Sequence, residues 1–165
     1  MTLADAFIAE FQQEARGTRR LLERLPEDKL SFKPHPKSTS LGGLATHIAH
    51  IPEWTGTIVN DSIFDVGLVD ARTPERKSRQ EILDHFEKNA KRFVDLLSGK
   101  SDEHLKESWT LKNKGAQVLT LPRVACLRTF ILNHVIHHRG QLTVYLRMND
   151  VPLPALYGPS ADEGM

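Results

Sequence analysis

Hydrophobic side chains recur every three or four residues in four long stretches of this chain, the spacing of one buried face of an α-helix. The stretches run from about Leu3 to Leu25, from about Leu41 to Asn60, from Ser78 to Leu97 and from about Leu121 to Met148. Ser40, directly before the second stretch, is a typical helix N-cap. The pattern predicts an all-α protein, namely an antiparallel four-helix bundle that forms a single domain over residues 1–165.

Two connections between the predicted helices carry patterns of their own. Residues 107–120 alternate apolar and polar side chains on either side of residues 112–115, which predicts a short β-hairpin between the third and fourth helices. In residues 61–77 we expect Phe64, Val66 and Leu68 to pack onto the helices. Pro52 is expected to kink the second helix, because proline removes a helical N–H donor.

Composition narrows the class of protein. With 22 basic and 21 acidic residues the net charge is +1, which gives no electrostatic attraction for nucleic acid or an anionic membrane. The chain has no apolar run near the roughly 20 residues of a membrane span, and its first residues lack the pattern of a signal peptide. Cys126 is the single cysteine, which excludes an internal disulfide and suits a reducing compartment. We therefore expect a soluble, cytoplasmic protein.

Two histidines on the fourth predicted helix have the spacing of metal ligands. His134 and His138 are four residues apart, so they project about 40° from each other with Cβ atoms roughly 5–6 Å apart. Leu127 and Ile131 project in nearly the same direction, which predicts that the pair faces the interior. Surface helices also collect such pairs by chance, and the hypothesis of a metal site therefore needs a third histidine.

The second predicted helix supplies this third histidine. His47 shares an apolar stripe with Leu44 and Ile51, whereas His50 falls on the polar face with Glu53. Three neutral imidazoles in an apolar interior each carry a donor and an acceptor that need partners, and charging them together would be costly. A metal ion resolves both difficulties. The spacing thus predicts that one divalent ion is held by His47, His134 and His138, while His50 faces solvent.

The other polar candidates receive structural interpretations. His137 projects about 80° from the centre of the predicted site and is placed at its edge. We place the remaining histidines at the surface, and these are His35, His85 and His104. Cys126 is expected to be a buried, inert thiol, and Arg139 is expected to make structural bonds rather than to touch substrate.

The fourth predicted helix also has an apolar side that faces away from the site. Leu132 and Ile136 lie there, and a helix that is apolar on two sides is either central or covered by another subunit. We expect a homodimer through this helix. The alternative is that the hairpin covers the same patch.

Three segments of the sequence resemble the DinB/YfiT-like superfamily. They are Leu44–His50, Asn133–Leu142 and Val151–Glu163, and the likeness in element order spans nearly the whole chain. The resemblance implies a four-helix bundle, a frequent dimer and a divalent metal site whose ligands fall on His47, His134 and His138. It also implies thiol-dependent chemistry, because characterised members include S-transferases and a maleylpyruvate isomerase that use low-molecular-weight thiols.

Three protein ligands leave a metal ion with an open position for water or substrate. The leading hypothesis is therefore a metal-dependent thiol S-transferase acting on a small molecule. The alternatives are a hydrolase that uses metal-bound hydroxide and a non-catalytic metal-binding stress-response protein. Zinc or nickel is favoured, with iron or manganese open, since three imidazoles select poorly among metals. Gln141 and Tyr145 are the nearest predicted inward polar groups, and they are the candidates for proton transfer.

Overall fold

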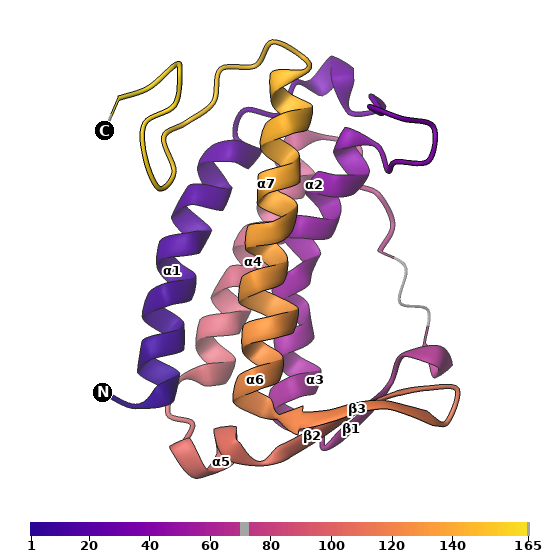
Figure 1. Ribbon diagram of the computed structural model, residues 1–165, viewed down its shortest axis with the longest axis vertical. Coiled ribbons are helices and arrows are strands. Elements are labelled where there is room, and N and C mark those ends of the chain that lie inside the picture. Colours follow the sequence, from indigo (N-terminus) through magenta and orange to yellow (C-terminus); the bar gives the residue numbers. More distant parts are fainter. Residues whose placement is uncertain (70–72, 165) are drawn as a thin grey trace.

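Long helices make up most of the molecule, and a small sheet lies at one end (Figure 1). The computed structural model describes residues 1–69 and 73–164. The helices are α1 (Leu3–Leu22), α2 (Leu41–His50), α3 (Thr55–Asn60), α4 (Arg79–Leu97), α5 (Asp102–Lys106), α6 (Arg123–Leu127) and α7 (His134–Arg147). The strands are β1 (Ile63–Asp65), β2 (Ser108–Asn113) and β3 (Ala116–Pro122). Shorter turns are the 3-10 helices η1 (Glu27–Lys29), η2 (Ile51–Trp54) and η3 (Val66–Leu68) and the π-helix η4 (Arg128–Asn133).

The long helices enclose a shared core. Helix α1 contacts α4 and α7, and α2 contacts the same two helices, so each long helix has two neighbours (Figure 1). Among the described residues, no helix combines the length and the apolar character needed to cross a membrane.

The helix starts follow the capping signals in the sequence. The Thr2 hydroxyl accepts a hydrogen bond from the Asp5 N–H, and the Asp5 carboxylate accepts one from the Thr2 N–H, which completes the capping box of α1. Ser40 caps α2 and Ser78 caps α4 through their hydroxyl oxygens. These side chains satisfy N–H groups that have no partner within the helix.

Two of the four predicted helices are interrupted. The second is divided into α2, the 3-10 turn η2 and α3, and Pro52 lies in the first turn of η2, as the expected kink requires. The fourth is divided into α6, the π-helical turn η4 and α7. A π-helical turn bonds five residues apart, so a rotation of 100° per residue does not carry through it.

The packing of the fourth predicted helix corrects one sequence-based expectation. Leu132 was expected on the outer side of the helix, but it is only 1% exposed and belongs to the hydrophobic core. It therefore cannot contribute to an apolar outer patch. Ile136, the other residue of that patch, is partly exposed, and the homodimer stays a prediction.

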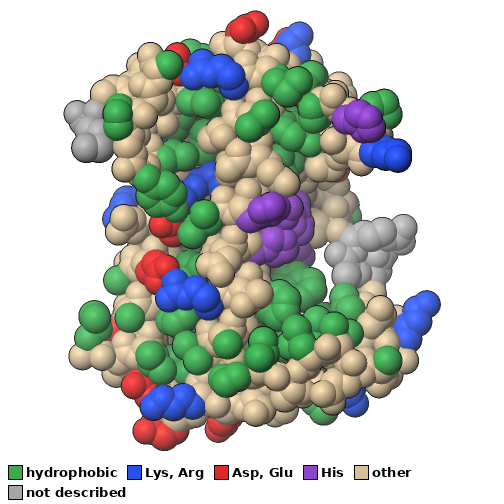
Figure 2. Space-filling view, viewed as in Figure 1, with side chains coloured by type: hydrophobic (Ala, Val, Ile, Leu, Met, Phe, Trp, Pro, Cys, Tyr) green, Lys and Arg blue, Asp and Glu red, His purple; other side chains and the backbone are tan. Residues whose placement is uncertain are grey.

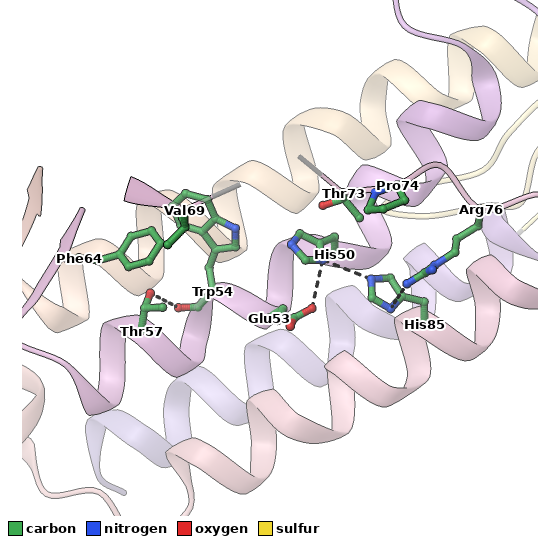
Figure 3. Close-up of a pocket in the computed structure, with 10 residues that line it drawn as sticks. All are labelled: His50, Glu53, Trp54, Thr57, Phe64, Val69, Thr73, Pro74, Arg76 and His85. Carbon is green, nitrogen blue, oxygen red and sulfur yellow. Dashed lines mark hydrogen bonds and ion pairs between the residues drawn. The ribbon is translucent and has the colours of Figure 1, made fainter. Parts of the chain in front are cut away.

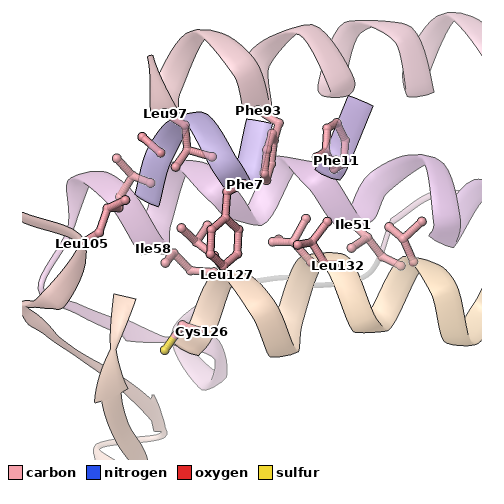
Figure 4. Packing of buried hydrophobic residues seen from close by; sticks show 14 of the residues in the cluster. Phe7, Phe11, Ile51, Ile58, Phe93, Leu97, Leu105, Cys126, Leu127 and Leu132 are labelled. Carbon is pink, nitrogen blue, oxygen red and sulfur yellow. The ribbon is translucent and has the colours of Figure 1, made fainter. Parts of the chain in front are cut away.

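The core consists of two hydrophobic clusters stacked along the helices. Figure 4 shows the cluster nearer the sheet, where the rings of Phe11 and Phe93 stack with centroids 3.9 Å apart. The second cluster lies toward the other end and joins α2, α4 and α7 through Leu44, Phe86 and Leu142. Burial of these side chains is the main force that holds the helices together.

The expected hairpin is part of a larger, mixed sheet. Strands β2 and β3 pair antiparallel, and the two residues between them, Lys114 and Gly115, both have positive φ, as a tight hairpin turn requires. Strand β1, which no sequence pattern predicted, pairs parallel with β2. The Asp65 carboxylate accepts hydrogen bonds from the Lys114 and Gly115 N–H groups, and these bonds lower its pKa. The fold is thus mostly helical with a three-stranded sheet.

The long connection before α4 packs only in part as expected. Phe64 packs against Trp54 with ring centroids 5.6 Å apart. Leu68 was expected to pack onto the helices, but it is 77% exposed. Pairing of β1 with β2 directs this part of the chain along the sheet rather than over the helices.

A buried ion pair joins α7 to α1. Arg139 Nη2 lies 2.5 Å from Glu14 Oε2, and the two residues are 3% and 8% exposed. The Tyr157 hydroxyl donates to the same carboxylate oxygen at 2.7 Å. The structural role predicted for Arg139 is confirmed by these bonds.

We expect Arg139→Met to lower the free energy of unfolding by about 3–5 kcal/mol, because the substitution leaves the buried Glu14 carboxylate without its partner. Urea denaturation of the metal-free protein measures the loss. Arg147→Met is the matched control on the same helix: its ion pair with Asp162 is exposed, so its loss should stay below about 1 kcal/mol. Equal losses in the two variants would contradict the role given to the buried pair.

Candidate metal centre

Helices α2 and α7 bring three imidazole rings together. His47 lies on α2, His134 is the first residue of α7, and His138 follows one turn later. The Nε2 atoms of His47 and His134 are 3.2 Å apart, and one nitrogen from each of the three rings lies within 4.8 Å of the others. Two atoms bound to one ion at 2.0–2.1 Å in a tetrahedron are about 3.3 Å apart. The three residues that the spacing selected therefore converge, with a separation compatible with a divalent metal ion.

The rings lie at the border between core and surface. All three histidines are half-buried, and the fully buried side of α7 is formed instead by Val135, Arg139, Leu142 and Leu146. The pair on α7 thus faces α2 rather than the centre of the core. Figure 2 shows histidine side chains gathered midway along the molecule, beside a recess with hydrophobic walls. A small molecule can therefore reach the imidazoles.

Burial keeps these imidazoles neutral. Burial first, and then the nearby rings of His138 and His134, lower the pKa of His47 to about 4. Burial also lowers the pKa of His134 and of His138, although the bond to Gln141 opposes the shift in His138. A neutral imidazole has a free lone pair, which is the form that binds metals.

Gln141 fixes the orientation of His138. His138 Nδ1 lies 2.7 Å from Gln141 Oε1, and because an amide oxygen can only accept, the imidazole must donate from Nδ1. Its Nε2 lone pair is then available on the other side of the ring. The Gln141 amide group lies 3.2 Å from His137 Nε2, which places the exposed His137 at the edge of the cluster, as predicted.

Tyr145 lies away from the three imidazoles. It follows His138 by two helical turns, about 10 Å along the axis. Its hydroxyl donates to the Thr39 carbonyl at 3.3 Å, and its ring packs edge-on against Phe32. The structure therefore places one of the two candidate polar residues, Gln141, against a histidine of the cluster.

An apolar cavity of about 250 Å³ opens beside the cluster. Its described walls are His47, His50, Ile51, Trp54, Leu111, Phe130 and His134. Trp54 comes from the 3-10 turn η2, Leu111 from strand β2 and Phe130 from the π-helical turn η4. The interruptions of the helices thus supply cavity walls. Leu111 and Phe130 could not be assigned to the site from the sequence, because no periodic pattern shows that a strand and a π-helical turn meet at one cavity.

A comparison with known families identifies the chain. The DinB family model matches residues 1–164. This chain belongs to the DinB family. The uncharacterized protein YrdA of Bacillus subtilis strain 168 is 29% identical over 160 residues, which cover 96% of this chain and 90% of YrdA.

Solved structures of DinB-like proteins share the fold. A DinB-like protein from Bacillus cereus ATCC 10987 is 28% identical with a TM-score of 0.71, and the match covers 93% of this chain and 97% of that one. A putative DinB family member from Exiguobacterium sibiricum 255-15 is 16% identical with a TM-score of 0.67, and the match covers 91% and 93% of the two chains. At this lower identity the likeness concerns the fold alone.

The positions of the other histidines in this DinB family chain differ in part from those predicted. His35 is exposed, as expected. His104 was placed at the surface but is half-buried, with its Nε2 2.9 Å from the Val59 carbonyl oxygen. His50 and His85 were also placed at the surface, yet both are half-buried and their rings face each other. The reason is that the polar face of α2 packs against α4 instead of facing water.

We expect the metal-free protein to lose stability as pH falls from about 6.5 toward 4. In that range the unfolded chain protonates His47 while the folded chain keeps it neutral. The unfolded state then binds more protons, so the free energy of unfolding falls with pH. The contribution of His47 is on the order of 2 kcal/mol after allowance for its partial exposure.

Urea denaturation across a pH series, with a chelator present, measures this slope. His47→Gln should make the slope shallower, with the remainder due to the other buried histidines, whereas His35→Gln, in an exposed loop, should keep the wild-type slope. An unchanged slope in His47→Gln would contradict the assignment.

Proposed function

We propose that this chain is a divalent-metal-dependent enzyme that transfers a low-molecular-weight thiol to a small electrophile with an apolar body. The observation that carries the proposal is the convergence of three neutral imidazoles, two of which line an apolar cavity. His47, His134 and His138 would hold the ion, for which zinc or nickel is the preferred choice. A divalent ion held there would lower the pKa of a small thiol that reaches it and so supply a nucleophilic thiolate at neutral pH.

The number of ligands favours an open site. Structural zinc sites close the ion with four protein side chains, whereas catalytic sites use three and leave a position for substrate. Among the described residues, the group that holds these three histidines contains no further histidine, cysteine or carboxylate. Two of the three imidazole rings, those of His47 and His134, line the cavity. The open coordination position is therefore available to a molecule bound in the cavity.

Residues of the chain itself would perform the remaining tasks. Ile51, Trp54 and Phe130 bind the apolar body of the electrophile and exclude water from it. Gln141 is a positioning residue, because it accepts the Nδ1 proton of His138 and so keeps Nε2 free. In the transfer, a sulfur–carbon bond forms while the leaving group departs with the electron pair of its bond. The thiol proton passes to solvent.

The apolar walls favour thiol transfer over hydrolysis. Hydrolysis of an ester or amide develops charge on oxygen, which enzymes stabilise with preorganised hydrogen-bond donors. Of the seven described lining residues, only the imidazoles and Trp54 have a side-chain N–H group. A displacement by thiolate places less demand on such donors.

We expect His134→Ala to lose one equivalent of bound metal and the thiol transfer activity together, because two imidazoles hold an ion much more weakly than three. Elemental analysis measures the metal. Transfer of glutathione, cysteine or another small thiol to a chlorinated aromatic probe measures the activity. His35→Ala is the control and should keep both the metal and the activity.

Turnover of ester probes without thiol would contradict thiol transfer in favour of hydrolysis. Metal binding without any turnover would contradict the proposal that the protein is an enzyme.

We expect Gln141→Leu to weaken metal affinity about 10–100-fold, because the His138 ring loses the acceptor that orients it. Competition with a chromophoric chelator measures the affinity. Gln141→Glu retains an acceptor and should restore binding to within a few-fold of the wild type. Gln141 is exposed, so neither substitution disturbs the core. Equal affinity in Gln141→Leu and wild type would show that Gln141 has no positioning role.

A further inference from the structure

A second cluster of metal-ligating side chains lies outside the three-imidazole site. His50 is the last residue of α2, Glu53 lies in η2 and His85 lies on α4. Figure 3 shows the three side chains pointing toward one another at the side of a cavity. His50 Nδ1 is 3.1 Å from Glu53 Oε2 and 3.3 Å from His85 Nε2. The proposed thiol transfer does not use Glu53 or His85.

The separations match those of ligands around one ion. Atoms bound at 2.0–2.1 Å in a tetrahedron lie about 3.3 Å apart, and both distances from His50 Nδ1 are close to this value. Two imidazole nitrogens and one carboxylate oxygen also form a ligand set that holds catalytic zinc in proteins. The ligand atoms of all three residues lie within 4.8 Å of one another.

Without an ion, the cluster is held by a shared proton. A neutral imidazole has a single N–H, so His50 can offer one proton from Nδ1 to two acceptors, the Glu53 carboxylate and the His85 nitrogen. The lone pairs of Glu53 and His85 therefore point at this proton, and the other tautomer of His50, with its proton on Nε2, turns a third lone pair to the same position. A divalent cation that replaces this proton would bind the same three atoms at once.

The surroundings hold the three side chains in place. Burial lowers the pKa of His50 and of His85, which leaves both rings neutral near pH 7. The Arg76 guanidinium lies 3.4 Å from the other nitrogen of His85, and Arg92 lies 3.6 Å from the other oxygen of Glu53. Asn89 Nδ2 also lies 3.3 Å from His85 Nε2, one of the facing atoms, so a cation bound there would take the place of this contact.

We propose that His50, Glu53 and His85 bind a second divalent cation of the zinc class. This ion links the α2–η2 segment to α4 and has its open side on a cavity of about 330 Å³. His50 and Trp54 line both this cavity and the apolar cavity beside the first site. Occupancy of the second site therefore fixes a wall that the two cavities share.

Counting zinc per chain tests the proposal. Each protein is stripped with chelator, equilibrated with buffered zinc and analysed for bound metal. We expect His85→Ala and Glu53→Gln each to hold one zinc fewer than the wild type, and the double variant His85→Ala/His134→Ala to hold none. Glu53→Gln nearly preserves side-chain shape, so it answers the question even if His85→Ala fails to fold. Lys88→Ala, an exposed substitution on α4, is the matched control and should bind as the wild type does.

The decisive quantity is the difference in bound zinc per chain between the wild type and the variants His85→Ala and Glu53→Gln. Loss of one equivalent supports the site, whether or not the protein shows any thiol transfer. Unchanged zinc content in both His85→Ala and Glu53→Gln would overturn it. The proposal can therefore fail while the proposed function stands, and the reverse is also true.

Discussion

The contact between α2 and α7 imposes the constraint on which the rest of the account depends. It places His47 against His134 and His138 in a half-buried position where charged imidazoles are disfavoured. Neutral rings at this separation present lone pairs to a common point. The opposite side of α7 is held against α1 by the buried Arg139–Glu14 pair, so the orientation of α7 is fixed from both sides. The site is thus a consequence of helix packing rather than of a flexible loop.

The candidate enzyme site depends on irregular backbone beside the three imidazoles, because these segments line the cavity there. An uninterrupted pair of helices would pack side chain against side chain and leave little room beside the rings. Instead, the 3-10 turn at Pro52 and the π-helical turn before His134 interrupt the two helices and place Trp54 and Phe130 on the cavity wall. The mixed sheet then supplies a further apolar wall through Leu111. The same 3-10 turn places Glu53 beside His50, so one irregularity serves both proposed metal sites.

Regular helices could be predicted from the sequence, and interactions between helices could not. His134 and His138 lie within the uninterrupted α7, and His47 lies within α2, so local periodicity was sufficient to select them. Leu132 lies three and seven residues before Val135 and Arg139, on the side of α7 that packs into the core. The sequence pattern instead predicts that the histidine-bearing side faces inward. His50 and His85 were assigned to solvent because periodicity separates polar from apolar faces but does not show which polar face meets another helix. The parallel pairing of β1 with β2 joins residues far apart in the sequence, and no local sequence pattern predicts such a pairing.

X-ray absorption at the zinc edge tests the central claim most directly. The suitable sample is the His85→Ala variant loaded with one equivalent of zinc, because only the three-imidazole site then contributes. We expect three imidazole nitrogens at about 2.0–2.1 Å and, once a small thiol is added, one sulfur at about 2.3 Å. A zinc shell without imidazole scattering, or one that gains no sulfur from added thiol, would contradict it.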